Sequence, residues 1–332
     1  MNMQTQNQKF SRLLAALAVG TLATVLVGQA ANAAMLASDN AGNYSATAGA
    51  TNLWPNGTST LNGGTGFGAW TLDATNPSPS YAGAYLAIPS YTWPKSEAIA
   101  TDGGYIWGIY SGGGAVGAIP TMSADRALEN STNTGLGTLR SGQVLSIAMK
   151  NAGIGTTDVG SQAPTFGLSL VTGSGATGTT SVFTIAFTEL APNTGANTSA
   201  NTVLDTTITD AGTPTSYVEG VNANALTAAG LNGGVDIAFA LGSADSYALT
   251  ISAASGNTNV PAPLTYSGTV NGAINQANVF DSMAGHDGLF NSLAVTNATP
   301  TPEPATLPLF ALAGAGVLLL RARCGNKIRD RA

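Results

Sequence analysis

Charge, cysteine and histidine are all scarce in this chain. Charged residues make up 8% of its 332 residues, and it has one cysteine, Cys324, and one histidine, His286. A single cysteine excludes an intramolecular disulfide. One cysteine and one histidine are also too few for a zinc site of the usual Cys/His type within one chain. The stability of the folded part must therefore come from a large apolar core.

Basic residues are scarcest in the middle of the chain. Between residues 34 and 300, four lysines and arginines stand against fifteen aspartates and glutamates, a net charge of −11. Nucleic-acid binding needs a basic footprint, so we expect no nucleic-acid partner. Glycine, in contrast, is abundant at 42 residues. The composition is that of an acidic, weakly charged protein suited to the outside of a cell.

Residues 1–33 have the layout of a secretory signal peptide. Two basic residues precede an apolar stretch over residues 13–27, and Ala31 and Ala33 supply the small side chains that signal peptidase reads. This pattern predicts export and cleavage between Ala33 and Ala34. The alternative is a retained membrane helix, but fifteen residues are few for a hydrocarbon core of about 30 Å.

Residues 34–298 have the pattern of β-strands separated by turns. Short runs rich in Val, Ile, Phe, Tyr and Thr alternate with Gly, Asn, Ser and Pro clusters. The expected strands are residues 67–72, 105–110, 144–149, 166–171, 181–188, 203–209, 235–241, 247–252, 264–270 and 289–296. Residues 121–130 fit either a short helix or a strand. We therefore predict one all-β domain, an antiparallel sandwich, flanked by an N-terminal signal helix and a C-terminal transmembrane helix.

The tail, residues 299–332, has a proline-rich motif, an apolar run and a basic end, in that order. The motif and the start of the basic end are marked by Pro302, Glu303, Pro304, Arg321 and Arg323. The sixteen residues of the apolar run, 305–320, span about 24 Å as a helix. The basic end predicts a cytoplasmic C-terminus.

This order of parts resembles the PEP-CTERM protein-sorting signal. The resemblance implies a Gram-negative bacterium, handling at the inner membrane by an exosortase-type sorting protease, and final placement at the cell surface or in an exopolysaccharide or biofilm matrix. A simple C-terminal anchor is the alternative. The two differ in whether the anchor is later removed.

Strand and turn phrases in the middle resemble bacterial secreted proteins with a concanavalin-A-like (laminin-G-like) jelly-roll domain. These phrases are residues 62–72, 140–151, 165–170, 182–190, 240–251 and 278–295. The resemblance implies a last strand that returns beside the first, and a structural or glycan-binding role. A minority of that family are glycosidases.

No arrangement of residues predicts catalysis. His286 lies in a turn-like AGHDG segment, and the chain has no G-x-S-x-G nucleophile elbow. The acid pairs Asp125 with Glu129 and Asp205 with Asp210 do not alternate as two carboxylates on one strand face would. We therefore expect no enzyme, with a carbohydrate-active enzyme whose site is unrecognised as the alternative.

Two further groups are candidates for ligand contact. Asp281, Asp287 and Asn291 could share a calcium ion with backbone carbonyls, or could simply form turns, so we expect no cofactor and keep calcium as the alternative. Trp54 and Trp93 each precede a proline and look like loop residues. Aromatic rings in loops are apolar platforms for sugars, so these two tryptophans are the predicted ligand contacts.

Overall fold

The computed structural model describes residues 33–44, 54, 63–75, 81–87, 99, 105–112, 120–128, 136–151, 164–173, 180–190, 203–282 and 287–298. Residues 1–32 and the tail 299–332, with the helices expected there, lie outside the described residues. Trp93 and His286 lie outside them as well. Within these ranges no helix is long and apolar enough to span a membrane.

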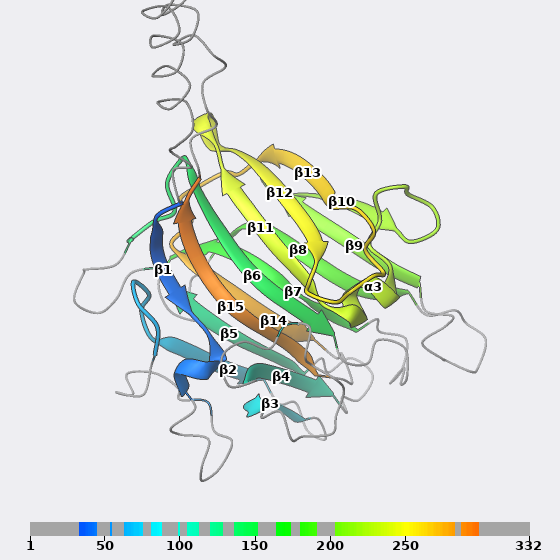
Figure 1. The fold of residues 1–332 in the computed structure, drawn as a ribbon, viewed down its shortest axis with the longest axis horizontal. Coiled ribbons are helices and arrows are strands. Elements are labelled where there is room, and N and C mark those ends of the chain that lie inside the picture. The colour runs from blue at the N-terminus through cyan, green and yellow to red at the C-terminus, as the bar shows by residue number, and fades with distance from the viewer. Residues whose placement is uncertain are drawn as a thin grey trace, which may run out of the picture. The chain divides into compact units, whose positions relative to one another are not determined.

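The sequence from Ala34 to Ala298 forms one compact unit built from two β-sheets (Figure 1). Sheet A has the order β13-β12-β11-β6-β15-β4-β3, with β1 also paired to β15, and sheet B has the order β10-β9-β8-β7-β14-β5-β2. All pairings between the described strands are antiparallel. The predicted all-β class and antiparallel sandwich are confirmed.

The strands of sheet A are β1 (Met35–Asp39), β3 (Tyr81–Ala87), β4 (Ile106–Gly112), β6 (Gln143–Asn151), β11 (Val235–Leu241), β12 (Ser246–Ala253), β13 (Leu264–Thr269) and β15 (Gly288–Asn297). Those of sheet B are β2 (Trp70–Thr75), β5 (Thr121–Ala127), β7 (Thr165–Thr172), β8 (Thr180–Leu190), β9 (Val203–Asp210), β10 (Thr213–Val218) and β14 (Gln276–Ser282). The described helices are short: η1 (Ala41–Tyr44), α3 (Ala228–Gly233) and η3 (Ser243–Asp245).

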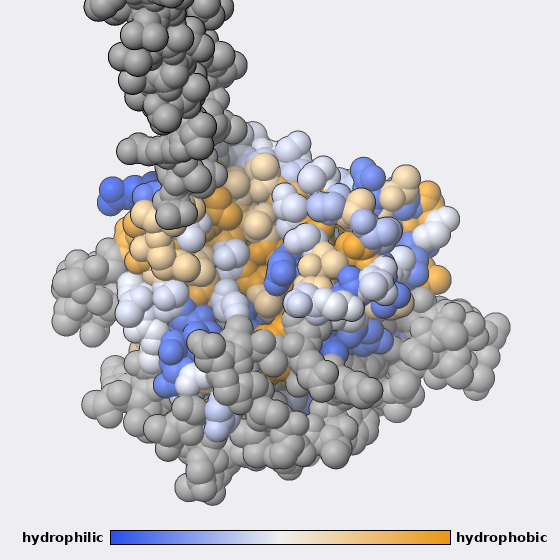
Figure 2. Space-filling view, in the orientation of Figure 1, coloured by the Kyte–Doolittle hydropathy of each residue, from blue (hydrophilic) through white to orange (hydrophobic). Residues whose placement is uncertain are grey.

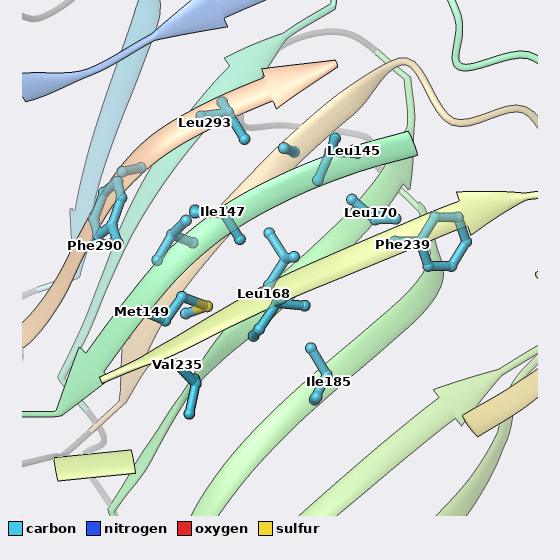
Figure 3. Close-up of a cluster of buried hydrophobic side chains, with 14 of the residues drawn as sticks. Leu145, Ile147, Met149, Leu168, Leu170, Ile185, Val235, Phe239, Phe290 and Leu293 are labelled. Carbon is cyan, nitrogen blue, oxygen red and sulfur yellow. The ribbon is translucent and has the colours of Figure 1, made fainter. Parts of the chain in front are cut away.

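The core lies between the two sheets. On β11, Val235, Ile237 and Phe239 are buried while Asp236 between them is exposed, as a period of two requires. Figure 3 shows the side chains of β6, among them Ile147, meeting those of β7, among them Leu168. Burial of apolar surface at roughly 25 cal/mol per Å² is the main force that holds the sheets together.

The chain closes on itself through β1 and β15. Met35 lies opposite Thr296 and Asp39 opposite Leu293, in an antiparallel pair. The last strand thus returns beside β1, which is absent from the expected strands. The first expected strand, residues 67–72, overlaps β2 instead, and β2 pairs with β5 in sheet B. The sequence allowed either a short helix or a strand over residues 121–130. Residues 121–127 form strand β5, which lies between β14 and β2.

A buried ion pair joins the start of the fold to sheet B. Arg126 on β5 lies 2.8 Å from Asp39 at the end of β1, and neither side chain is more than 1% exposed. Asp39 also accepts hydrogen bonds from Asn43, Tyr44 and Trp70 at 2.9, 2.7 and 3.0 Å. Burial raises the pKa of the Asp39 carboxyl, and the Arg126 guanidinium opposes that rise. The pair thus ties β1 and η1 to β5 and β2.

Candidate functional site

Trp54 lies in the core, so its choice as a ligand contact is wrong. Its side chain is 5% exposed. It stacks on Trp107 with ring centroids 5.6 Å apart and meets Trp70 edge-on at 5.0 Å. Phe290 completes this aromatic cluster, with its ring centroid 5.4 Å from that of Trp54. A sugar therefore has no access to the Trp54 ring.

A different set of aromatic residues is gathered on β3 and β4. The register places Tyr81 opposite Gly112, Tyr110 opposite Gly83, and Tyr85 opposite Gly108. Each tyrosine of this group thus faces a glycine across the strand pair. Neighbouring ring centroids are 6.1 Å apart, from Tyr81 to Tyr110 and from Tyr110 to Tyr85. We call these three rings the tyrosine ladder.

The glycines let the hydroxyl end of each ring approach the backbone of the opposite strand. A Cβ at Gly83 would stand 2.6 Å from the hydroxyl oxygen of Tyr110, and one at Gly112 would stand 3.0 Å from that of Tyr81. At Gly108 a Cβ would collide with the ring of Tyr85. Because no side chain rises from the opposite strand, each ring covers the backbone across from it. Glycine in a strand often marks such a close approach.

The ladder lies on the outer face of sheet A. Leu86 on β3 and Trp107 and Ile109 on β4 are fully buried in the core between the sheets. Tyr85 and Tyr110 alternate with these residues and therefore face the other way. Tyr81 is 55% exposed, and the other two rings are partly buried. Since β3 ends the strand order of sheet A, the ladder runs along an edge of the sheet.

A carboxylate adjoins the inner end of the ladder. The Tyr85 hydroxyl is hydrogen-bonded to Asp287, which directly precedes β15. Burial raises the pKa of Tyr85, and the negative charges of Asp287 and Asp281 raise it further. Tyr85 is thus held as a neutral phenol with its orientation fixed. The ladder combines apolar ring faces with hydroxyl groups and one acidic neighbour.

Each of the three residues considered for calcium is engaged in hydrogen bonds. Asp287 is bonded to the Tyr85 hydroxyl, as described above. Asp281 is fully buried and accepts a hydrogen bond from Ser111 at 2.5 Å. Asn291 is also fully buried: its Oδ1 accepts from the backbone of Ala41, and its Nδ2 donates to the carbonyls of residues 99 and 105. In the part of the chain that the structure describes, no three His, Cys, Asp or Glu side chains are grouped to hold a metal ion.

The acid pairs considered for glycoside hydrolysis are engaged in structural bonds. Asp125 is 5% exposed and accepts hydrogen bonds from Gln276 and Asn278 of β14. Asp205 accepts from Ser216 on β10, and Asp210 accepts from Tyr247 on β12. These carboxylates therefore join strands to each other. Glu129 lies outside the described residues.

No protein-family model matches this chain, and no curated protein matches it by sequence. Among solved structures, the calreticulin globular domain of T. cruzi aligns at TM-score 0.38 and 6% identity, over 68% of this chain and 84% of that one. The receptor binding domain of botulinum neurotoxin type G aligns at 0.29 and 8%, over 69% and 43%. Winged bean acidic lectin complexed with methyl-alpha-D-galactose aligns at 0.29 and 11%, over 68% and 98%. At these scores the alignments carry no functional argument, and the sandwich is established by the strand pairing itself.

Proposed function

We propose that this chain is an exported protein of the cell envelope or extracellular matrix whose sandwich binds glycans through the tyrosine ladder. The observation that carries the proposal is the row of Tyr81, Tyr110 and Tyr85, each lying over a glycine on the outer face of sheet A. Sugar rings present C–H groups on their faces, and these pack on flat aromatic rings while hydroxyl groups at the ring edge form hydrogen bonds.

The rings are held in place before any ligand binds. Tyr110 is flanked by the other two rings at 6.1 Å on each side, and the Tyr85 hydroxyl is bonded to Asp287. A preorganised surface loses little side-chain entropy on binding, which favours affinity. Three rings in a row along a sheet edge also match an extended polymer better than a single small molecule, since a polymer can lie along the row.

The negative charge of the domain indicates which class of polysaccharide it can bind. The net charge of −11 between residues 34 and 300 and the adjacent Asp287 disfavour a polyanion. The proposed ligand is therefore a neutral polysaccharide.

Retardation of the full chain in gels that contain the exopolysaccharide of the producing strain tests the site. We expect the Tyr81→Ala/Tyr110→Ala variant to bind at least tenfold more weakly, a loss of about 1.4 kcal/mol, because two of three ring faces are removed. Tyr81→Phe/Tyr110→Phe is the matched control and keeps most of the affinity, since the ring faces remain. Unchanged retardation of a folded alanine variant would show that the tyrosine ladder is not the binding site.

We propose further that the tail is a PEP-CTERM sorting signal, recognised through Pro302–Pro304 and processed by an exosortase-type protease at the inner membrane. The support is the order of proline motif, apolar run and basic end in residues 299–332. The intact mass of the mature surface protein tests this. We expect a species that starts at Ala34 and ends near Pro304, whereas a species ending at Ala332 would make the tail a permanent anchor.

A further inference from the structure

A concave surface lies at the other edge of sheet A, around β13. It is a groove of about 400 Å³ lined by Tyr217, Asn224, Ala248, Thr265, Tyr266 and Ser267. Tyr217 belongs to β10 of sheet B and Tyr266 to β13 of sheet A, and their rings meet edge to face at 4.7 Å. The groove therefore runs where the two sheets are joined by an aromatic contact.

The floor and walls of this groove are fixed. Tyr266 is 7% exposed, and its hydroxyl donates to the backbone carbonyl of Asn224, which holds the segment after β10 against β13. Ser267 lies opposite Ala248 in the β12–β13 register, and Thr265 lies opposite Thr250. Thr265, Ser267 and Ala248 are exposed on the outer face of the sheet, next to the buried ring. The volume falls within the range of small-ligand sites, roughly 300–1,000 Å³.

The lining suits a neutral sugar. It offers the hydroxyl groups of Thr265 and Ser267, one side-chain amide and the partly buried ring of Tyr217, and none of the six lining residues carries a formal charge. Because β13 ends the strand order of sheet A, half of its backbone N–H and C=O groups point away from β12 and can meet sugar hydroxyls. Figure 2 shows weakly polar and apolar residues interspersed where β12 and β13 lie. A phosphate or carboxylate ligand would find no cation among these lining residues.

The groove and the tyrosine ladder lie at opposite edges of one sheet. β13 stands first and β3 last in the strand order of sheet A, and Figure 1 shows them on opposite sides of it. A single chain segment of a polysaccharide that follows one edge therefore leaves the other edge free for a second chain.

We propose that the β13 groove is a second saccharide site, specific for neutral sugars, and that it makes the domain a bivalent cross-linker of polysaccharide chains. The cross-linking part rests on the proposed function of the ladder, whereas the groove site stands on its own lining. Bivalent attachment raises the effective concentration at the second site, so weak individual contacts give firm attachment to a matrix.

The test uses the full chain with three soluble neutral polysaccharides, a β-1,3-glucan, a galactomannan and a dextran, and with alginate as the polyanion. Equilibrium titration with oligosaccharides of each counts the sites, and light scattering of the mixture with polymer reports cross-linking. The groove variant is Thr265→Val/Ser267→Ala, which removes two exposed hydroxyls. Thr269→Val, an exposed change on the same strand outside the groove, is the matched control.

We expect two sites in the wild-type chain for at least one neutral polymer, and none for alginate. Affinity at one site falls roughly tenfold in the groove variant, as the loss of two hydrogen bonds predicts, and cross-linking is lost in both the groove variant and Tyr81→Ala/Tyr110→Ala. One site that only the ladder variant removes would overturn the groove and leave the proposed function standing. One site that only the groove variant weakens would overturn the ladder and leave the groove site standing. No binding to any neutral polymer would overturn the groove site as stated.

Discussion

At the scale of single residues, the ion pair between Asp39 and Arg126 is an interaction whose loss should destabilise the fold strongly. Both side chains are within 1% of complete burial, and Arg126 also donates to the Gly63 carbonyl at 2.7 Å and lies over the rings of Phe67 and Trp70. Removing one partner of a buried pair leaves the other charge without compensation in a medium of low polarity. The interaction is therefore costly to break from either side.

Arg126→Met should lower the free energy of unfolding by about 3–5 kcal/mol, the usual cost of an uncompensated buried charge. The double variant Asp39→Asn/Arg126→Met should recover part of this loss, because the amide that replaces the carboxylate carries no charge to bury. Urea unfolding at pH 7 measures both. Arg140→Met, an equal charge change at an exposed position, serves as control and should cost less than about 0.5 kcal/mol. A loss in Arg126→Met no larger than in Arg140→Met would contradict the proposed role of the pair.

The residue scale is also where sequence reasoning about the site fails. A tryptophan before a proline indicates a loop, but the sequence does not show that Trp54 packs against Trp107 and Trp70. Conversely, the sequence marks the three tyrosines of the ladder only as aromatic residues. Their arrangement depends on the glycines opposite them, and that pairing is defined only once the register of β3 and β4 is known.

At the scale of elements, sequence patterns identify strands with apolar alternation and miss polar strands. β11 matches its predicted residues 235–241, because Val235, Ile237, Phe239 and Leu241 alternate with less buried residues. β14 is absent from the predicted strands, since its Gln276, Asn278 and Asp281 look like loop residues. Each finds a partner from another strand: Gln276 and Asn278 bond Asp125, and Asp281 bonds Ser111.

Edge strands escape prediction for a different reason. β10 ends sheet B, and four of its six residues are exposed, so no apolar face marks it in the sequence. β3 ends sheet A and is rich in alanine and glycine, which have low strand propensity. Both strands carry tyrosines that line a proposed site. Sequence patterns thus miss two edge strands that contribute to the proposed sites, whereas β13, at the edge of the groove, matches its predicted residues 264–270.

At the scale of the whole molecule, tyrosine ionisation should govern stability in alkaline solution. Burial raises the pKa of Tyr266 to about 12, and it raises the pKa values of Tyr44, Tyr85 and Tyr247 as well. In the unfolded chain these phenols ionise near pH 10. Only two lysines, Lys95 and Lys150, occur between residues 34 and 300, so few other side chains of this region lose a proton near pH 10.

Because the folded-state pKa values lie above the unfolded ones, the stabilisation from these tyrosines is complete below about pH 10 and is lost as the pH rises toward the folded values. Each such tyrosine contributes a slope of about 1.4 kcal/mol per pH unit in that window.

Urea unfolding between pH 8 and 11.5 should show constant stability up to about pH 9.5 and a steep decline above it. Tyr266→Phe should reduce the slope, since phenylalanine has no proton to lose. Phenolate absorbance should rise at higher pH for the folded chain than for the chain in urea. Superimposable absorbance curves would show that the tyrosines are open to solvent, which would also contradict the enclosed ring packing around β13 and β10.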